Sequence, residues 1–478
     1  MTPLLHPLML AGTGSDVGKS VIATALCRIF LQDGFRPAPF KAQNMALNSF
    51  VTPDGLEIGR AQAVQAEAAG IECTADMNPL LLKPQSDHTS QVVLEGKPVG
   101  TSSAYDYFRH EGREMLRERV NAAFDRLAAL YNPIVMEGAG SISELNLRDA
   151  DLVNMPMARH ADADVILVGD IDRGGVFASV YGSIALQSDE DRRRIKGIIV
   201  NKFRGDMRLF DEGVGIMERI CQVPVIGVVP YFTDIHIEEE DSVDLGLKQK
   251  RRLEGMINVA VVMLRYISNY TDFNTLERQE GVHLFYTNNT DDIMNADIII
   301  LPGSKSTIAD LSLLRLNGVA GAILRAHRRG ATVIGICGGY QMMGRWVEDP
   351  LHVEGDTERM PGLGLLPIVT RMGGEKTTRR VRTSIAGIDV EGYEIHNGES
   401  QPDALFTIVD PHTMGTYIHG ILDNEAFIDY LLKPFAAKRQ RQTTPTDYKE
   451  YKEEQYDKLA DHVRRHIDME KLYSILKK

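Results

Sequence analysis

The stretch Gly335-Ile336-Cys337-Gly338-Gly339 follows an apolar run from Ala331 to Ile336 and precedes a helix-like stretch from Tyr340 to Trp346. This order of strand, glycine-flanked cysteine and helix predicts a nucleophile elbow, in which a tight turn holds one side chain above the edge of a sheet. Glycines are needed because a Cβ on either flank would collide with the adjoining strand or helix. The N-terminus of the following helix faces the sulfur and favours its thiolate form. We therefore predict a reactive Cys337, although a lone cysteine is more often a buried structural residue.

Around this elbow, short apolar strands alternate with helical stretches along most of the chain. Such alternation predicts α/β domains, each with a doubly wound, mostly parallel sheet that helices cover on both faces. The stretch 19–32 is expected to be helical. The expected strands are 7–11, 37–40, 134–136, 165–168, 197–200, 225–229, 257–264, 298–301, 332–336 and 416–418.

A change in composition divides this pattern into two halves. The acidic residues 238–241 and the basic residues 248–252 have no apolar period between them, which is typical of a solvated linker. We therefore place one domain at 1–245 and a second at 252–440. The charged, tyrosine-rich residues 441–478 are expected to form C-terminal helices packed on the outside.

The overall composition limits the possible functions. The chain has 478 residues, of which 25% are charged and 43% hydrophobic, and its net charge is -13. An acidic chain is a poor candidate for a general nucleic-acid or membrane-surface role, because both require a basic face. Its 4 cysteines give neither a disulfide framework nor a paired metal-ligand spacing. With neither signal peptide nor membrane span indicated, we expect a cytoplasmic protein, and the sequence gives no indication of its oligomeric state.

A glycine-rich loop lies between the first expected strand and the first expected helix. It is one residue longer than the strict P-loop spacing. The backbone amides of such a loop surround phosphates, its lysine neutralises the terminal phosphates, and the hydroxyl that follows holds Mg²⁺. A chance Gly-Lys-Ser turn is the alternative. The residues predicted to bind ATP are Gly12, Thr13, Gly14, Ser15, Val17, Gly18, Lys19 and Ser20.

Polar residues at other strand ends are candidates for the same site. Glu137 ends the strand that begins at Ile134, and Asp170 follows another strand. Ligands bind at the carboxyl ends of parallel strands, and Mg²⁺ that bridges phosphates needs one or two carboxylate oxygens. We assign Glu137 to Mg²⁺ beside Ser20 and keep Asp170 as the rival. Lys41 is expected at the same edge, where it would add positive charge to the transferring phosphoryl group, although a surface lysine is an equally good interpretation.

Three residues of the second half are candidates for the chemistry at Cys337. Gly303 follows an expected strand, and a glycine there exposes backbone amides that would stabilise a tetrahedral oxyanion. His419 also follows an expected strand and is our choice for the base that cysteine-based acyl transfer requires. His396 competes for that role, and a hydrogen-bonded structural histidine is the commoner fate of such a residue.

Several longer motifs carry a resemblance to a known family. In the second half, Gly-Ile-Cys-Gly-Gly-Tyr-Gln, Leu-Pro-Gly-Ser-Lys-Ser-Thr and Tyr-Ile-His-Gly resemble class I glutamine amidotransferase domains. Together with motifs of the first half, they make the chain similar to the cobyric acid synthase family, in which a dethiobiotin-synthetase-like P-loop domain is fused to such a domain. The resemblance covers residues 8–435. Besides the P-loop, it rests on residues 40–45, 57–62, 77–84, 170–177, 201–206 and 267–273.

The resemblance implies an ATP- and glutamine-dependent ligase of cobalamin biosynthesis. Family members amidate the b, d, e and g carboxylates of adenosylcobyrinic acid a,c-diamide to give adenosylcobyric acid. A carboxylate is a poor electrophile, so ATP would convert it to an acyl phosphate. Ammonia would come from glutamine through a thioester on Cys337, with His419 transferring protons. The expected cofactors are ATP and Mg²⁺, and the expected partners are glutamine and a corrinoid, for which residues 42–82 form part of the predicted surface.

One position departs from the amidotransferase pattern. Many such domains carry a glutamate two residues after the catalytic histidine, whereas this chain has Ile421 there and Asp423 out of phase. We therefore predict a Cys337–His419 dyad with no third member assigned. One alternative function is a synthase that amidates the a and c carboxylates of cobyrinic acid, which the stretch Lys41–Met45 disfavours. Another is a P-loop ATPase switch with a non-catalytic amidotransferase domain.

Overall fold

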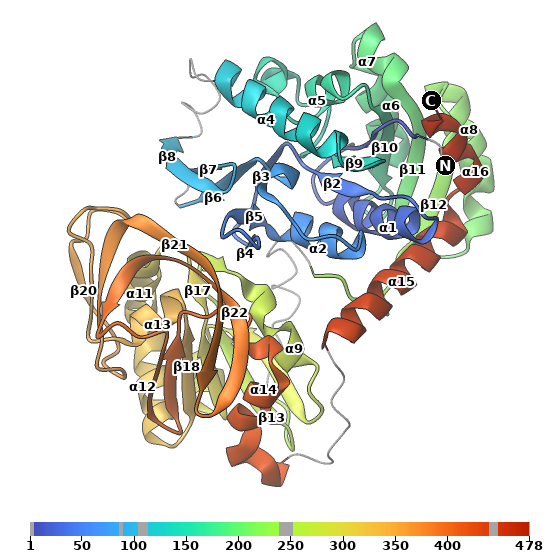
Figure 1. Ribbon diagram of the computed structural model, residues 1–478. Coiled ribbons are helices and arrows are strands. Elements are labelled where there is room, and N and C mark those ends of the chain that lie inside the picture. The colour runs from blue at the N-terminus through green and yellow to red at the C-terminus, as the bar shows by residue number, and fades with distance from the viewer. Residues whose placement is uncertain (1–3, 86–88, 104–112, 239–251, 439–447, 478) are drawn as a thin grey trace.

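The computed structural model describes residues 4–85, 89–103, 113–238, 252–438 and 448–477. Two α/β domains follow one another along the chain, in blue to green and in yellow to orange in Figure 1, and C-terminal helices follow in red. The prediction of two mostly parallel α/β domains with C-terminal helices is confirmed.

The first domain is built on a six-stranded sheet in which all neighbouring strands are parallel. In spatial order its strands are β12 (Val225–Pro230), β11 (Ile195–Phe203), β10 (Asp164–Asp170), β1 (Leu8–Gly12), β9 (Ile134–Glu137) and β2 (Ala38–Phe40). Successive side chains of a strand point to opposite faces, so the buried β1 supplies two cores. Leu8 and Leu10 belong to one core, and Met9 and Ala11 to the other.

Helices cover both faces of this sheet. On the face of Leu8 and Leu10 lies α1 (Lys19–Gln32), with part of α2 (Arg60–Ala68) beside it. The opposite face carries α4 (Arg113–Ala128), α5 (Met155–His160), α6 (Val176–Ala185) and α8 (Asp211–Cys221), while α7 (Asp189–Arg194) leads into β11. With both faces covered, the strands read as nearly continuous apolar runs.

The second domain has a six-stranded sheet of its own. In spatial order its strands are β15 (Val282–Thr287), β13 (Ile257–Val262), β16 (Ile298–Leu301), β18 (Thr332–Ile336), β24 (Thr413–Thr416) and β23 (Phe406–Asp410). Only the edge pair β23–β24 is antiparallel. Its helices are α9 (Asn274–Glu277), α10 (Thr290–Met294), α11 (Thr307–Leu316), α12 (Val319–Arg328), α13 (Gly338–Met343) and α14 (Glu425–Leu432).

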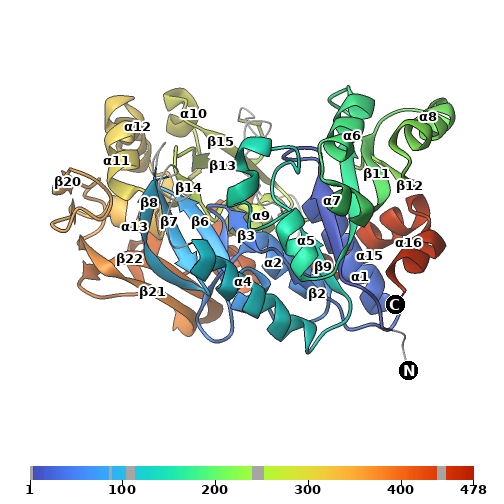
Figure 2. The same ribbon diagram turned by 90° about the horizontal axis from the view of Figure 1, so that it is seen from above.

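Small sheets that the sequence pattern does not reveal lie between and beside the two main sheets. One consists of β3 (Gln43–Met45), β6 (Leu80–Pro84), β7 (Thr89–Leu94) and β8 (Lys97–Ser103), on the side of the first domain that faces the second in Figures 1 and 2. Two short pairs are β4 (Ser49–Val51) with β5 (Glu57–Gly59), and β14 (Ile267–Ser268) with β17 (Gly303–Ser304). A last sheet joins β19 (Trp346–Glu348) and β20 (Arg359–Pro361) to the long hairpin β21 (Val369–Ile385) and β22 (Ile388–Gln401).

The C-terminal helices return to the first domain. Within α15 (Tyr448–His466) and α16 (Met469–Leu476), apolar side chains such as Leu459 and Leu472 are buried in the same core as α1. The amide of His6 donates to the carbonyl of Leu476 at 2.8 Å. Both ends of the described chain therefore lie on the first domain, as Figure 1 shows.

Two predicted boundaries near the candidate site are wrong. The helix expected at 340–346 is α13, which ends at Met343 because Gly344 is extended, so that Trp346 begins β19. The strand expected at 416–418 ends at Thr416, and His419 follows it in an isolated bridge to Tyr393.

Two parts of the sequence interpretation fall outside the described residues: most of the expected linker, at 239–251, and the first residues of the C-terminal extension, at 441–447. Among the residues that are described, no single helix has the length and apolar character needed to cross a membrane. The pair α11 and α12, bent by 79°, meets that test by length and composition only.

Candidate active sites

Cys337 occupies a strained turn between β18 and α13. Its φ of 52° and ψ of -108° are unfavourable for a residue with a side chain, and such strain is concentrated at functional sites. A Cβ on Gly339 would lie 1.9 Å from the carbonyl oxygen of Leu301, and one on Gly335 would lie 2.7 Å from the backbone of Gly339. The glycines around the cysteine are therefore required by close backbone contacts, and the turn has the form of the elbow that the sequence predicts.

His419 lies beside this thiol and is held by a carboxylate. Its Nδ1 is 2.7 Å from Oδ2 of Asp272, and the amide of Gly420 donates to Oδ1 of the same residue at 3.2 Å. Because Nδ1 is bonded to Asp272, Nε2 is left for Cys337. The imidazole ring interacts directly with Cys337. Burial opposes charge on the ring, but Asp272 and Cys337 outweigh it and raise the pKa of His419 to about 10.

The two other candidates near this base have different partners. His396 has both ring nitrogens engaged, by Oε1 of Glu394 at 3.2 Å and by the carbonyl of Gly398 at 3.1 Å. Its ring also stacks on Tyr417 at 3.8 Å, so it has the contacts of a structural histidine. Asp423 accepts the hydroxyl of Thr275 at 2.7 Å and does not hold the imidazole of His419.

The turn of Cys337 lies against β17, which contains Gly303. A Cβ on Gly338 would lie 2.8 Å from the amide nitrogen of Ser304, so the backbones of the turn and of β17 approach closely. Gly303 pairs with Ser268, and a Cβ there would lie 3.3 Å from Cε1 of His419. The absence of a side chain at Gly303 therefore lets β17 approach His419, and the backbone amides at Gly303 stay the predicted stabilisers of an oxyanion.

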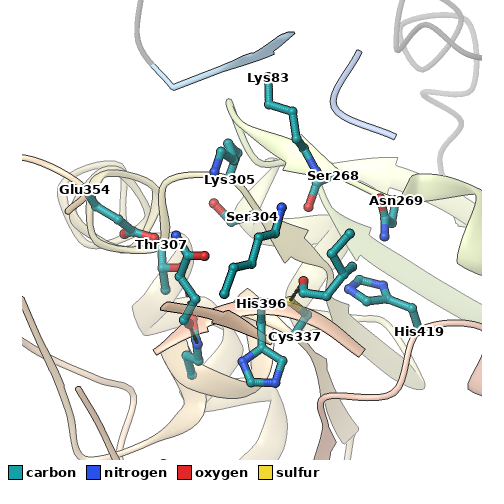
Figure 3. A pocket seen from close by; sticks show the side chains of 14 residues that line it. Lys83, Ser268, Asn269, Ser304, Lys305, Thr307, Cys337, Glu354, His396 and His419 are labelled. Atoms are coloured by element: carbon teal, nitrogen blue, oxygen red, sulfur yellow. Dashed lines mark hydrogen bonds between the residues drawn. The ribbon is translucent and has the colours of Figure 1, made fainter. Parts of the chain in front are cut away.

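Figure 3 shows the cavity into which this thiol faces. Cys337 and His419 form part of its wall, and Gln341 and Asn397 of the second domain line it as well. The thiol donates to the carbonyl of Ile395 at 3.6 Å. Polar side chains dominate this wall, and three of them are lysines.

The glycine-rich loop of the first domain joins β1 to α1 as predicted. Lys19 donates to the carbonyls of Gly14 at 2.9 Å and Gly140 at 3.0 Å, so that its ammonium is held across the loop. Gly18 has a φ of 93°, and a Cβ there would lie 2.1 Å from Nδ2 of Asn201. The amide of Thr13 donates to the carbonyl of Val168, and a Cβ on Gly12 would meet the side chain of Lys19. Val17 is buried, and its carbonyl accepts a hydrogen bond from the side chain of Asn201. Ser15 is exposed.

Glu137, the last residue of β9, lies beside the start of α1, where the sequence predicts a Mg²⁺ ligand. Its Oε1 accepts Ser20 at 2.8 Å and Lys41 at 2.9 Å, and its Oε2 accepts Gln65 at 3.0 Å. Burial favours its neutral form, but Lys41 lowers the pKa of Glu137 below its ordinary value, helped by Gln65 and Ser20. The carboxylate is therefore charged and the site polar.

These groups fit Mg²⁺ held together with a nucleotide. The ion binds one or two carboxylates and completes its shell with phosphates and water. Ser20 and Glu137 supply two oxygens, and the side-chain oxygen of Gln65 is buried beside them without a hydrogen-bond partner. Within the described part of the chain there is no cluster of three or more His, Cys, Asp or Glu side chains of the kind that binds a metal by protein groups alone.

Asp170 has other contacts. Its Oδ2 is 3.2 Å from Nζ of Lys202 and 3.9 Å from Nε of Arg173. Lys202 also donates to the carbonyl of Asp16 in the loop. The rival carboxylate therefore ties β10 and β11 to the loop, while Ser20 and Lys41 converge on Glu137.

The two sites are joined by a short segment of the first domain. Lys41 contacts Glu137, and a few residues later Asn48 and Ser49 contact the second domain. The amide of Ser49 donates to Asn269 Oδ1 at 3.1 Å, and the amide of Tyr270 donates to Asn48 Oδ1 at 3.2 Å. This part of the second domain immediately precedes Asp272.

Sequence reasoning missed Asp272 and Gln65 as members of these sites. Both fall outside the positions that a motif assigns to a metal or a base, and each is found through its contact with a predicted residue. Asp272 has one signal in the sequence, because it lies within the stretch 267–273 that carries the family resemblance.

Comparisons with known proteins match both halves of the chain. A CobQ/CobB/MinD/ParA nucleotide binding domain matches residues 8–244, and a CobB/CobQ-like glutamine amidotransferase domain matches residues 258–427. A cobyric acid synthase of Bacteroides fragilis is 67% identical over 100% of this chain and 99% of its own length. The cobyric acid synthase of Parabacteroides distasonis is 54% identical over 99% of both chains, and that of Syntrophobacter fumaroxidans is 48% identical over 98% of both.

Proposed function

Since this chain belongs to the cobyric acid synthase family, we propose that it amidates the b, d, e and g carboxylates of adenosylcobyrinic acid a,c-diamide to give adenosylcobyric acid. It is an enzyme of the ligase type with a nucleotide-binding and a glutamine amidotransferase domain. In the proposed reaction, ATP activates each carboxylate and glutamine supplies the ammonia.

The first domain would perform the activation. The terminal phosphoryl group of ATP passes to a carboxylate oxygen of the corrinoid, which gives an acyl phosphate and ADP. Lys19 and the loop amides hold the phosphates, Ser20 and Glu137 would hold Mg²⁺, and Lys41 brings a second positive charge to the transferring group. When bound, Mg²⁺ neutralises charge on the phosphates. Ammonia then attacks the acyl carbon, and phosphate leaves.

The second domain would release the ammonia. A raised pKa keeps His419 protonated at neutral pH, and an imidazolium beside a cysteine favours the thiolate. The thiolate of Cys337 attacks the side-chain carbonyl carbon of glutamine, the C–N bond breaks, and His419 gives its proton to the departing nitrogen. Water then attacks the thioester, His419 takes a proton from it, and the sulfur leaves as a thiolate with glutamate as the product.

The observation that supports this proposal most strongly is the Cys337–His419–Asp272 arrangement in a chain that also carries the P-loop. Neither half alone accounts for an amide ligase. An ATPase switch with an inert second domain would not need a strained cysteine beside a base that a buried carboxylate orients.

The proposal is tested by the products of the wild-type enzyme and of Cys337→Ala. With ATP and glutamine, the wild-type enzyme is expected to amidate the a,c-diamide and to leave cobyrinic acid unchanged, as measured by product mass. Cys337→Ala is expected to lose glutamine-supported amidation and to keep activity with added ammonium salts, because only the ammonia source is removed. Loss of both activities in a folded variant would contradict two separate sites. Amidation of cobyrinic acid at its a and c positions would favour the a,c-diamide synthase instead.

A further inference from the structure

Three lysines from two domains line the cavity of Cys337. Lys305 follows β17 and Lys376 lies in β21, both in the second domain, whereas Lys83 lies in β6 of the first domain. Figure 3 shows Lys83 and Lys305 on one side of the cavity, away from Cys337 and His419. We call these three residues the lysine cluster. The chemistry at the thiol and the base, as described above, makes no use of them.

The described carboxylates do not balance the positive charge of the cluster. Lys83 and Lys376 share one partner, Glu57, whose side chain is 0% exposed; Nζ of Lys83 lies 2.7 Å from its Oε1, and Lys376 contacts its Oε2. Lys305 donates to the neutral side-chain oxygen of Gln91 at 2.9 Å, and no ion pair of Lys305 is found in the described part of the chain. Among the described residues, the cluster of three amines therefore forms ion pairs with a single carboxylate, that of Glu57.

Burial makes the charged forms of these lysines unfavourable. Burial lowers the pKa of Lys305 to about 7, with Lys376 and Lys83 adding to the effect. Burial likewise lowers the pKa of Lys376 to about 8 against the opposing effect of Glu57. Glu354, a carboxyl that lines the wall, has a pKa raised to about 7 by burial, so it carries only part of a charge at neutral pH. An anion entering the cavity would restore the positive charge of these amines.

We propose that the lysine cluster binds the α-carboxylate of glutamine, with Lys305 as its direct partner. The inference rests on the proposed function of Cys337, because the same cavity must then hold glutamine with its side-chain amide at the thiol. The free α-carboxylate distinguishes glutamine from a glutamine side chain within a protein. An analogue without the α-carboxylate would leave this buried cation without an anionic partner. Such an analogue therefore binds more weakly than glutamine.

Because Lys83 belongs to the first domain, residues of both domains form the proposed glutamine site. Lys83 reaches the cavity from the first domain and donates to Ser49 Oγ at 2.8 Å, and Ser49 is bonded to Asn269 of the second. Bound glutamine therefore contacts a cation of the synthetase domain, and the site is complete only when the two domains are packed together.

The experiment compares glutamine with glutamine α-amide, in which a neutral carboxamide replaces the α-carboxylate. Release of ammonia from each is measured for the wild-type enzyme, for Lys305→Met and for Lys433→Met, an exposed lysine of the same domain. For Lys305→Met we expect KM for glutamine to rise on the order of 10- to 100-fold with little change in kcat. The α-amide is expected to be hydrolysed about equally by the wild-type enzyme and by Lys305→Met, and Lys433→Met should behave as the wild type.

Several outcomes would overturn the inference. They are an unchanged KM in Lys305→Met, an equal loss on both substrates, or a wild-type enzyme that does not distinguish the substrates. Ammonium-supported amidation by Lys305→Met shows that the variant is folded, because that reaction does not use the glutamine cavity. Failure of the proposed function is seen separately, as a wild-type enzyme that hydrolyses no glutamine at all.

Discussion

Asp272 precedes His419 by 147 residues in the chain, and its carboxylate lies 2.7 Å from the imidazole. Many amidotransferases have a glutamate two residues after the histidine, where this chain has Ile421, and we propose that Asp272 takes the role of that glutamate. A buried carboxylate in this position fixes the orientation of the ring and stabilises the imidazolium. The dyad that the sequence predicts thus has an additional, orienting member in the structure.

Asp272→Asn should move the pH dependence of glutamine hydrolysis. The raised pKa of His419 keeps the imidazolium through neutral pH and releases its proton as the pH rises through about 10. Without the carboxylate, the largest effect that opposes burial is lost, so the pKa of His419 falls and the alkaline limb of kcat/KM moves to lower pH. The rate at neutral pH is expected to fall by at least about 100-fold. The measurement is the pH profile of kcat/KM for glutamine.

Asp423→Asn is the matched control, because Asp423 contacts Thr275 and not the imidazole of His419. Its profile should follow that of the wild-type enzyme. An alkaline limb that stays in place in Asp272→Asn would show that the carboxylate does not hold the protonated base.

Much of the chemistry of single residues could be predicted from the sequence, because the elbow and the P-loop are local motifs. Cys337, Lys19 and Ser20 lie within such motifs. The contacts of Lys376 and Asp272 could not be predicted, although Asp272 lies in a stretch that carries the family resemblance, because these contacts are made between segments far apart in the chain. Side-chain contacts of this kind depend on the packing of the domains, for which a single sequence holds no local signal.

Among the elements, the short helical turn that carries Asp272 is held from the other domain. This turn, residues Tyr270–Phe273, begins with an amide that donates to Asn48 Oδ1 at 3.2 Å. Asn48 in turn belongs to the segment that starts at Lys41, beside Glu137. One continuous stretch of the first domain therefore contacts both Glu137 and the turn whose Asp272 holds His419.

Asn48→Ala should weaken glutamine hydrolysis and leave ammonium-supported amidation intact. The variant removes the acceptor that fixes the first amide of the turn, so Asp272 is held less firmly against His419. We expect kcat for glutamine to fall roughly three- to tenfold, which corresponds to the loss of one hydrogen bond. The two rates are measured side by side, with Asn146→Ala, an exposed asparagine of the first domain, as the control. An unchanged kcat, or an equal loss of both activities, would argue against this support.

The main strands and the first helix could be predicted from the sequence, and the small sheets could not. The strands of the two central sheets are continuous apolar runs, whereas short strands such as β14 and β17 have only 2 residues each. The hairpin β21–β22 mixes charged and apolar positions, because some of its side chains face the second domain, others the first domain and others solvent. No single period describes such a strand.

The interface between the two domains forms part of the cavity of Cys337. Burial alone would raise the pKa of Glu57, but Lys376 and Lys83 hold it well below the usual range, so a charged carboxylate of the first domain lies between lysines of both. Tyr393 of the second domain stacks on His419 and donates to the carbonyl of Ser49 of the first. His419 and the lysine cluster therefore both depend on how the domains are packed.

In the proposed reaction, ammonia released at Cys337 reaches the carboxylates that are activated in the first domain. The most direct measurement supplies glutamine labelled with ¹⁵N at the side-chain amide, together with ATP, the a,c-diamide and unlabelled ammonium, and determines the isotope content of the product by mass spectrometry. We expect the wild-type enzyme to place ¹⁵N in all four new amides and Cys337→Ala to yield only unlabelled product. Hydrolysis of the labelled glutamine by the wild-type enzyme without ¹⁵N in the corrinoid would contradict this expectation.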